Sequence, residues 1–286
     1  MIWSVVSKSE MDGFGTSPVF RFYREALGKN NIKLAVVDED DELDFVGPDD
    51  VVLLRTASKK LLGTIVRRGI KSTAEAFEAY EIIKDKAGLA VFLQDNEIQV
   101  PQQFSIDEVE DGKVYFVKPR YGSDSFGITI HNICRTKKDV GFQVMRLKSL
   151  GYESIIEEFI EGMDCTVACC SPYESELLTA AIDVECDETE GIQTRDCKVG
   201  FKECCSATED SEELEAVAKE VFDALGLKHH ARIDFRRDKD GNVYVIDVNL
   251  LPGLGPIDHF AKCFLLARNF SYADTMKMLV LSALNV

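Results

Sequence analysis

Two carboxylates, an amide and an arginine lie in two neighbouring apolar runs, in a pattern that could hold a divalent metal. Arg232 and Asp234 are two apart in the first run, and Asp247 and Asn249 are two apart in the second. Because side chains two apart on a strand point to one face, we expect each pair to share a face, with Val245 beside the second pair. The Asp-Lys-Asp-Gly turn between the runs predicts an antiparallel hairpin. Such oxygen ligands suit Mg²⁺, and a solvated hairpin with outward-facing acids is the alternative.

A second segment could hold phosphate groups. One predicted strand ends at Lys118, and another is expected over Ile128–His131. Small residues let backbone N–H groups approach an anion closely, and a lysine beside them adds positive charge. The spacing matches neither a P-loop nor a dinucleotide-binding turn, and an ordinary hairpin loop is the alternative. The small residues of the loop are Gly122, Ser123, Ser125 and Gly127.

A third segment could bind a planar base where two lobes meet. Within Ser154–Ala168 it predicts an apolar strand interrupted by two glutamates, then a glycine turn and another strand. A base could lie against Phe159 or Ile160 and hydrogen-bond to backbone groups and Glu157, while Asp164 could accept hydrogen bonds from ribose hydroxyls. An edge strand with exposed acids is the alternative for this segment taken alone.

Taken in order, these segments resemble the ATP-grasp superfamily, and most closely its D-alanine–D-alanine ligase branch. The resemblance covers roughly residues 72–270. It implies an α/β chain of α+β lobes with the ATP-grasp fold, and it implies ATP and two Mg²⁺ ions as cofactors, with Mn²⁺ as another metal that could serve. Lys86, within Ile83-Lys-Asp-Lys86, matches the Asp-Lys step that opens the ATP-binding part of the family.

The resemblance also implies a role for each site residue. The nucleotide would be bound by Lys86, Lys118, Ser123, Ser125, Glu157, Glu158, Phe159, Ile160, Asp164 and Lys198, the last on the γ-phosphate. The metal ligands would be Asp234, Asp247 and Asn249. The tetrahedral intermediate would be stabilised by Arg232 and the backbone N–H of Gly253, with Lys198 adding positive charge during phosphoryl transfer.

The activity that this resemblance implies is ATP-dependent ligation of a carboxylate to an amine. ATP would phosphorylate the carboxylate of an amino acid or short peptide, and an amine would attack the resulting acylphosphate. Preorganised donors would stabilise the developing oxyanion. Two other functions stay open: a kinase that phosphorylates a small-molecule hydroxyl, and a nucleotide-binding subunit without catalysis.

Departures from the ligase pattern concern the substrates. Asp247 stands where the family has a longer glutamate, and Asp258 stands where the D-alanine ligases have a serine that receives a carboxylate. An aspartate there would repel the acceptor, so we expect substrates other than two D-alanines. His259 could orient an acceptor or accept its proton, or it could be a packing or surface residue. Glu10 or Asp12 could replace the family's amine-binding glutamate.

The start of the chain predicts a small α/β domain with a parallel sheet. Strands are expected at Val5, over Ile32–Val37 and over Asp49–Thr56 with Arg55 at its carboxyl end, and helices over about 17–28 and 58–68. Ligands gather at the carboxyl ends of parallel strands, so Arg55 is a candidate substrate anchor, with a surface salt bridge as the alternative. This segment resembles the front domain of amino-acid ligases that modify ribosomal protein tails. We expect domains at residues 1–75, 76–155 and 156–286, the last with the metal and catalytic site.

The charge balance bears on the partners. The chain has 286 residues, with 33 basic and 50 acidic side chains and a formal net charge of −17. This excess of negative charge opposes binding to a nucleic-acid backbone or an anionic membrane surface. We therefore expect ATP and a small amino acid or peptide as partners, and neither nucleic acid nor membrane. The sequence leaves open whether the chain forms a homodimer.

Cysteine usage and the amino terminus predict a cytoplasmic protein. The nine cysteines include the adjacent pairs Cys169–Cys170 and Cys204–Cys205 but no CxxC pair. Adjacent cysteines cannot easily bridge each other or chelate one zinc ion, so we expect reduced, structural thiols. No basic segment with a long apolar core opens the chain, and no run reaches the ~18 apolar residues that span a bilayer.

Overall fold

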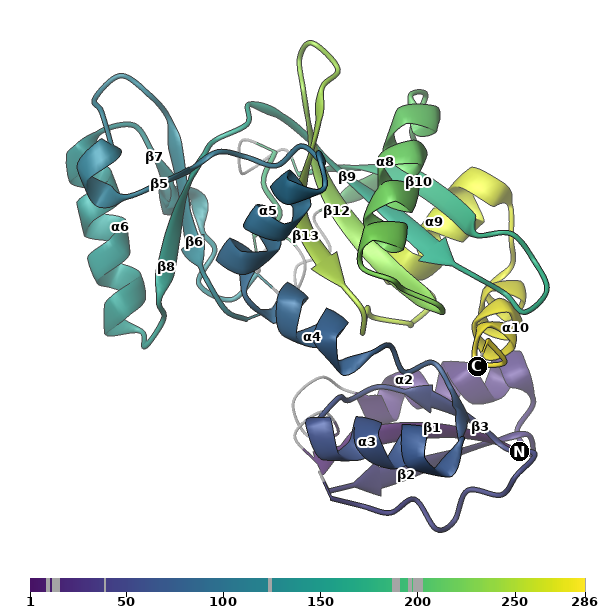
Figure 1. Ribbon diagram of the computed structural model, residues 1–286. Helices are drawn as coiled ribbons and strands as arrows, with labels where there is room; N and C mark the ends of the chain where they lie inside the picture. Colours follow the sequence, from purple (N-terminus) through teal and green to yellow (C-terminus); the bar gives the residue numbers. More distant parts are fainter. Residues whose placement is uncertain are drawn as a thin grey trace.

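The chain forms three β-sheets in succession, each covered by helices (Figure 1). The first sheet is parallel, whereas the second and third are antiparallel. This arrangement agrees with the prediction of a small parallel sheet in front of further α+β lobes. The computed structural model describes residues 1–8, 11, 16–38, 40–122, 125–186, 191–194, 197 and 203–285.

The first sheet has the strand order β2-β1-β3-β4 and lies between helices. Helix α3 begins after Ser58, whose side chain accepts a hydrogen bond from the backbone of Leu61, and it ends before Gly69 in the left-handed conformation. A serine N-cap and a glycine after the last turn are the usual helix signals, and the predicted helix is confirmed. The elements are β1 Ile2–Ser7, α2 Thr16–Leu27, β2 Ile32–Val37, β3 Val51–Leu54, α3 Lys59–Arg68 and β4 Lys71–Ser72.

The second sheet has the order β5-β8-β6-β7 and packs against helix α6. The prediction of a strand over Ile128–His131 is wrong, because a 3₁₀ turn, η2, follows Thr129 instead. The Asn132 side chain accepts from the Thr129 backbone and donates to the Val117 carbonyl, so side-chain bonds stabilise the turn and the strand starts later. The elements are β5 Gln103–Phe104, η1 Ile106–Glu108, β6 Tyr115–Pro119, η2 Ile130–Asn132, β7 Ile133–Cys134, α6 Lys137–Ser149 and β8 Ser154–Glu158.

The third sheet has the order β11-β10-β9-β12-β13 and is covered on both faces. On β9, Cys165, Val167 and Cys169 point into one core, whereas Ala168 and Cys170 point into the other. Helices α4, α5 and α8 close the first core, and α2, α9 and α10 close the second (Figure 1). The elements are α4 Phe77–Lys84, α5 Lys86–Asp95, β9 Gly162–Cys170, β10 Leu178–Glu185, β11 Cys204–Ala207, α8 Ser211–Ala224, β12 His230–Asp238, β13 Val243–Asn249, α9 His259–Arg268 and α10 Tyr272–Ser282.

Helices α4 and α5 precede the second sheet in the chain but pack on the third. The chain therefore runs from the first sheet across the third sheet before it forms the second. The domain ranges 1–75, 76–155 and 156–286 remain a prediction.

The predicted hairpin is formed by β12 and β13, but β13 contains a bulge. Asp234 pairs with Asp247, whereas Phe235 pairs with Val245, so Ile246 is an extra residue. The prediction that Val245 shares a face with Asp247 is therefore wrong, because Val245 points into the core. The extra residue shifts the alternation of side chains between the two faces by one position from there on.

Two cysteines differ from the prediction of reduced thiols. Cys186, after β10, and Cys197 form a disulfide, with their Cα atoms 6.9 Å apart. Cys134, Cys165, Cys169, Cys170, Cys204, Cys205 and Cys263 are free. Within the described ranges, no helix combines the length and the apolar character that crossing a bilayer requires.

Candidate active site

A cavity brings together residues that are far apart in the sequence and lie on the second and third sheets. Its empty volume, including the part open to solvent, is about 1040 Å³, enough for a small-molecule ligand. The predicted site residues that line it are Lys86, Lys118, Ser125, Glu157, Glu158, Phe159, Ile160, Asp164, Arg232, Asp234, Asp247 and Asn249.

Lys118 lies on β6 beside Glu157 on the neighbouring strand β8. Their Nζ and Oε2 atoms are 2.7 Å apart, and their side chains are only 10% and 5% exposed. The lysine also donates to the carbonyl of Ile246 at 3.1 Å, which is the bulged residue of β13. These two contacts hold the Lys118 ammonium group in the wall of the cavity.

Lys86 is the first residue of α5, and it points at the hairpin. Its Nζ lies 2.6 Å from Oδ1 of Asp247. The helix start is fixed by Asp85, which accepts from the backbone of Ala87 and binds Arg120 through two contacts of 2.7 Å. The hydrogen bonds from Arg120 hold the pKa of the Asp85 carboxyl below its usual range, so this anchor is ionised at neutral pH.

The hairpin places its acids across from each other. Asp234 pairs in register with Asp247, and Arg232 pairs with Asn249. The Arg232 guanidinium binds both carboxylate oxygens of Asp234, at 2.9 and 2.7 Å, and the Thr166 hydroxyl donates to the same carboxylate. Two carboxylates and an amide oxygen are the hard donors that a Mg²⁺ ion takes, so these side chains fit the metal by their chemistry.

Arg236 is a site residue that the sequence analysis missed. It donates to Asp164 at 2.8 Å and to the carbonyls of Ile160, Gly162 and Gly191 at 3.1, 3.0 and 2.6 Å, joining the segment between β8 and β9 to the third sheet. Burial raises the pKa of the Asp164 carboxyl, and Arg236 opposes that rise. Arg236 follows Asp234 by two residues on the same strand, so the spacing that placed Arg232 and Asp234 on one face could also have predicted Arg236 there.

The segment predicted to bind the base forms one wall of the cavity. Phe159 lies beside Phe116, with ring centroids 6.3 Å apart, and the Arg236 guanidinium lies 5.2 Å from its ring. The backbone N–H groups of Glu158 and Phe159 donate to Gln102 and Val114, so these donors are used within the protein. Glu157 is buried and Glu158 is exposed.

The loop that holds Gly253 is fixed from several sides. Arg55, just after β3, donates to the carbonyls of Pro252 and Leu251 at 2.6 and 3.3 Å. Asp258 accepts from the backbone of Gly255 at 2.6 Å. A Cβ atom at Gly253 would come within 2.7 Å of the Asp258 carboxylate, which explains the glycine.

Other predicted residues do not line this cavity or fall outside the described ranges. His259 points to β11, where its Nε2 is 2.9 Å from Oε1 of Glu203. The predicted residues that do not line the cavity are Arg55, Gly253, Asp258 and His259. Those outside the described residues are Glu10, Asp12, Ser123 and Lys198.

Comparison with known proteins decides the family. The family model described as D-ala D-ala ligase C-terminus matches residues 87–281, which is more than half of the chain. The chain belongs to this family. Its predicted resemblance to the D-alanine–D-alanine ligase branch is therefore confirmed.

Individual relatives extend this result. The D-alanine–D-alanine ligase of Maridesulfovibrio salexigens is 27% identical over 146 residues, 49% of this chain and 46% of the relative. That of Aquifex aeolicus is 29% identical over 142 residues, 48% and 46% of the two chains. The chain thus spans about half the length of these curated relatives.

A solved structure shows the fold. The D-alanine–D-alanine ligase of Bacillus anthracis complexed with ATP has a TM-score of 0.73 at 19% identity, over 99% of this chain and 97% of that one. The predicted ATP-grasp fold is confirmed.

Proposed function

We propose that this protein is an ATP- and Mg²⁺-dependent ligase that joins a carboxylate to an amine through an acylphosphate. One observation carries the proposal: a single cavity is lined by Lys86, Lys118, Arg232 and the acids Asp234 and Asp247. Two cations for phosphate oxygens, hard donors for a metal and a partly buried arginine for an oxyanion are the groups that this reaction needs.

The lysines would bind the phosphates of ATP. Each is now paired with a carboxylate, Lys118 with Glu157 and Lys86 with Asp247, at 2.7 and 2.6 Å. Phosphate oxygens would compete with these carboxylates for the ammonium groups, which suits a site that must release its nucleotide. Mg²⁺ held by Asp234, Asp247 and Asn249 would neutralise phosphate charge.

The reaction would run in two steps. An oxygen of the substrate carboxylate attacks the γ-phosphorus, the bond to the β-phosphate oxygen breaks, and ADP leaves. The amine nitrogen then attacks the carbonyl carbon, and the phosphate leaves with the bridging oxygen while the amine loses a proton. Arg232 and the Gly253 N–H would donate to the oxyanion formed in the second step, and loss of one such donor costs about 100- to 1000-fold in rate.

The substrates would be amino acids or short peptides other than two D-alanines. The supporting observation is Asp258, whose carboxylate lies against Gly253 and accepts from the Gly255 N–H. Its negative charge at the acceptor end of the site would disfavour an acceptor carboxylate. Arg55 supplies a positive group near the same loop.

The test is amine-dependent release of ADP from the full chain with Mg²⁺ and ATP. The proteinogenic amino acids and D-alanine are supplied singly and in pairs, and the products are identified by mass spectrometry. A condensed product formed together with ADP supports ligation, and a phosphorylated alcohol would show a kinase instead. D-alanyl-D-alanine as the preferred product would overturn the substrate proposal alone.

The variant Asp234→Asn tests the proposed metal site. It keeps the size of the side chain but removes the charge that a metal needs, so turnover should fall at least about 100-fold while circular dichroism stays unchanged. Retained turnover would contradict the metal role of Asp234. Asp238→Asn, in the exposed turn of the same hairpin, is the control and should keep full activity.

A further inference from the structure

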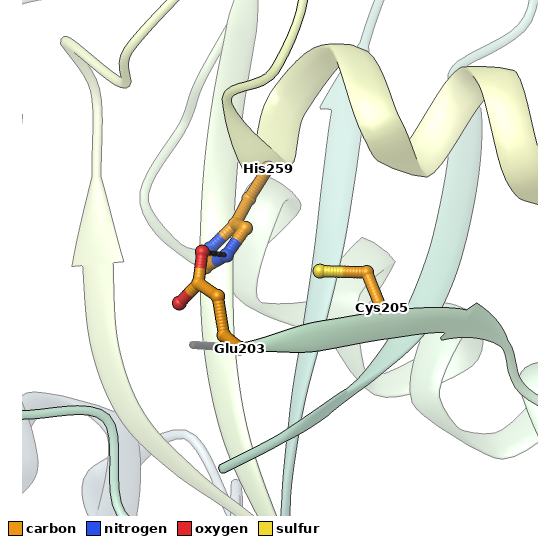
Figure 2. Close-up of side chains that lie close together, drawn as sticks. All are labelled: Glu203, Cys205 and His259. Carbon is orange, nitrogen blue, oxygen red and sulfur yellow. Dashed lines mark hydrogen bonds and ion pairs between the residues drawn. The ribbon is translucent and has the colours of Figure 1, made fainter. Parts of the chain in front are cut away.

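Three side chains with different donor atoms meet on the third sheet, away from the cavity (Figure 2). Glu203 directly precedes β11, and Cys205 is the second residue of that strand, so side chains two apart there point to the same side. His259 faces them from the first turn of α9, with its Nε2 2.9 Å from Oε1 of Glu203. One carboxylate oxygen, one sulfur and one imidazole nitrogen lie within 4.8 Å of one another.

We propose that Glu203, Cys205 and His259 form a second metal site, which binds a transition-metal ion of the Zn²⁺ class. Sulfur and nitrogen donors select such ions over Mg²⁺, which takes oxygen donors. Three protein ligands leave a fourth tetrahedral position to water. The site is therefore chemically distinct from the cluster of Asp234, Asp247 and Asn249.

Lys262 marks the place where a cation is favoured. It follows His259 by one turn of α9, and its Nζ is 3.5 Å from Sγ of Cys205 and 3.9 Å from Oε1 of Glu203. The ammonium group thus supplies positive charge to the same donors. Its side chain is 25% exposed, so it can turn into solvent when a metal ion takes over that charge.

Metal binding would fasten β11 to the start of α9. The Cys205 S–H bond breaks, a sulfur–metal bond forms, and the proton goes to solvent. The proton between Nε2 of His259 and the Glu203 carboxylate goes to solvent or to Nδ1, and the freed carboxylate oxygen and Nε2 would then each donate a lone pair to the metal. The residue before His259 is Asp258, which holds the Gly253 loop, so a bound ion would also stabilise the end of that loop.

The test is a titration of the full chain with Co²⁺ without nucleotide, followed by absorption spectroscopy. Cobalt bound to a thiolate gives a charge-transfer band that cobalt on oxygen donors lacks, so the carboxylate cluster does not interfere. We expect one thiolate-bound ion per chain. Zn²⁺ should remove the band by competition and should raise the melting temperature.

Two variants and a control make the test specific. Cys205→Ser should abolish the band. It should also weaken metal binding by at least about 10- to 100-fold, which is the loss seen when a residue hydrogen-bonded to a metal ligand is removed. Lys262→Met should tighten binding about 10-fold, because a competing charge is removed. Cys204→Ser is the control, since Cys204 is an exposed neighbour on the opposite face of the strand.

The proposal is overturned if neither the parent chain nor Lys262→Met gives the band. It is also overturned if the band survives in a folded Cys205→Ser or disappears in Cys204→Ser. The Lys262→Met result keeps the test decisive even if Cys205→Ser fails to fold.

Discussion

The cations of the cavity are each held by a carboxylate partner. Arg232 binds Asp234, and Arg236 binds Asp164, in the same way that the two lysines bind their acids. Unpaired charge in so little exposed a place would be costly, so these pairs stabilise four cations in one cavity of a chain with net charge −17. If the proposed function holds, phosphate oxygens would replace these carboxylates as the partners of the cations when a nucleotide binds.

Arg232 is the residue whose loss should affect the chemical step most directly. Arg232→Lys loses the planar fork that now binds Asp234, so turnover at saturating ATP should fall about 100- to 1000-fold with little change in the KM for ATP. Arg237→Lys is the control, because Arg237 lies on the same strand but binds Asp183. Equal rates for the two variants in the ADP-release assay would contradict the role of Arg232.

His230 predicts a specific dependence of stability on pH. Burial, with help from Arg55 and His229, lowers its pKa from 6.5 to about 3, so the folded ring stays neutral. The unfolded chain takes up a proton below pH 6.5 and the folded chain does not, so stability falls as the pH drops from 6.5 to about 3. The slope from this group is at most about 1.4 kcal/mol per pH unit.

His230→Leu should remove that slope. Urea unfolding at several pH values measures the free energy of unfolding, and the variant should lose less stability than the parent toward acid. His131→Leu serves as the control, since His131 is exposed. Parallel pH profiles for parent and His230→Leu would show that the buried imidazole is not the cause.

The bulge in β13 decides which residues of the hairpin face the cavity. The turn residues and the spacing of Arg232 and Asp234 were enough to predict two antiparallel strands. The extra residue, Ile246, was not predictable, because an apolar residue fits a regular strand as well as a bulge. The η2 turn was missed for a related reason: the bond from Asn132 to the Val117 carbonyl joins two separate segments.

The pairing of β6 with β8 makes two adjacent glutamates unequal. Glu157→Gln should lower the free energy of unfolding by about 1–3 kcal/mol, because the buried Lys118 loses its charged partner. Glu158→Gln, at the exposed next position, should change it by less than about 0.5 kcal/mol. Thermal unfolding measures both.

A non-hydrolysable ATP analogue with Mg²⁺ extends this test. The analogue should stabilise Glu157→Gln at least as much as the parent, because its phosphate oxygens offer Lys118 a new partner. If Glu157→Gln and Glu158→Gln lose equal stability, or if the analogue stabilises neither, Lys118 is not the phosphate ligand that we propose.

At the scale of the whole molecule, Arg55 connects the first sheet to the loop of Gly253. The sequence suggested a substrate anchor or a surface salt bridge for this residue. In the structure Arg55 donates to the carbonyls of Leu251 and Pro252, across 196 and 197 residues of sequence. A contact between residues so distant along the chain has no local pattern, so a single sequence could not predict it.

Arg55→Met should therefore act on turnover rather than on nucleotide binding. Without its hydrogen bonds the loop of Gly253 would shift, and a shift of about 1 Å can cost about 100-fold in rate. The KM for ATP should stay unchanged, because Arg55 does not line the cavity. Arg67→Met is the control, because it loses an exposed pair with Glu42 and a hydrogen bond to Thr64 within its own helix but no contact with the Gly253 loop. A raised KM for ATP with normal turnover would contradict the positioning role.

The central claim is that the substrate carboxylate is phosphorylated before the amine attacks, and isotope transfer tests it most directly. The carboxylate substrate that supports ADP release is labelled with ¹⁸O and incubated with the full chain, ATP, Mg²⁺ and the amine. The phosphate released is then examined by mass spectrometry. An acylphosphate predicts one ¹⁸O atom in the phosphate for each amide bond formed, whereas phosphate without the label would contradict it.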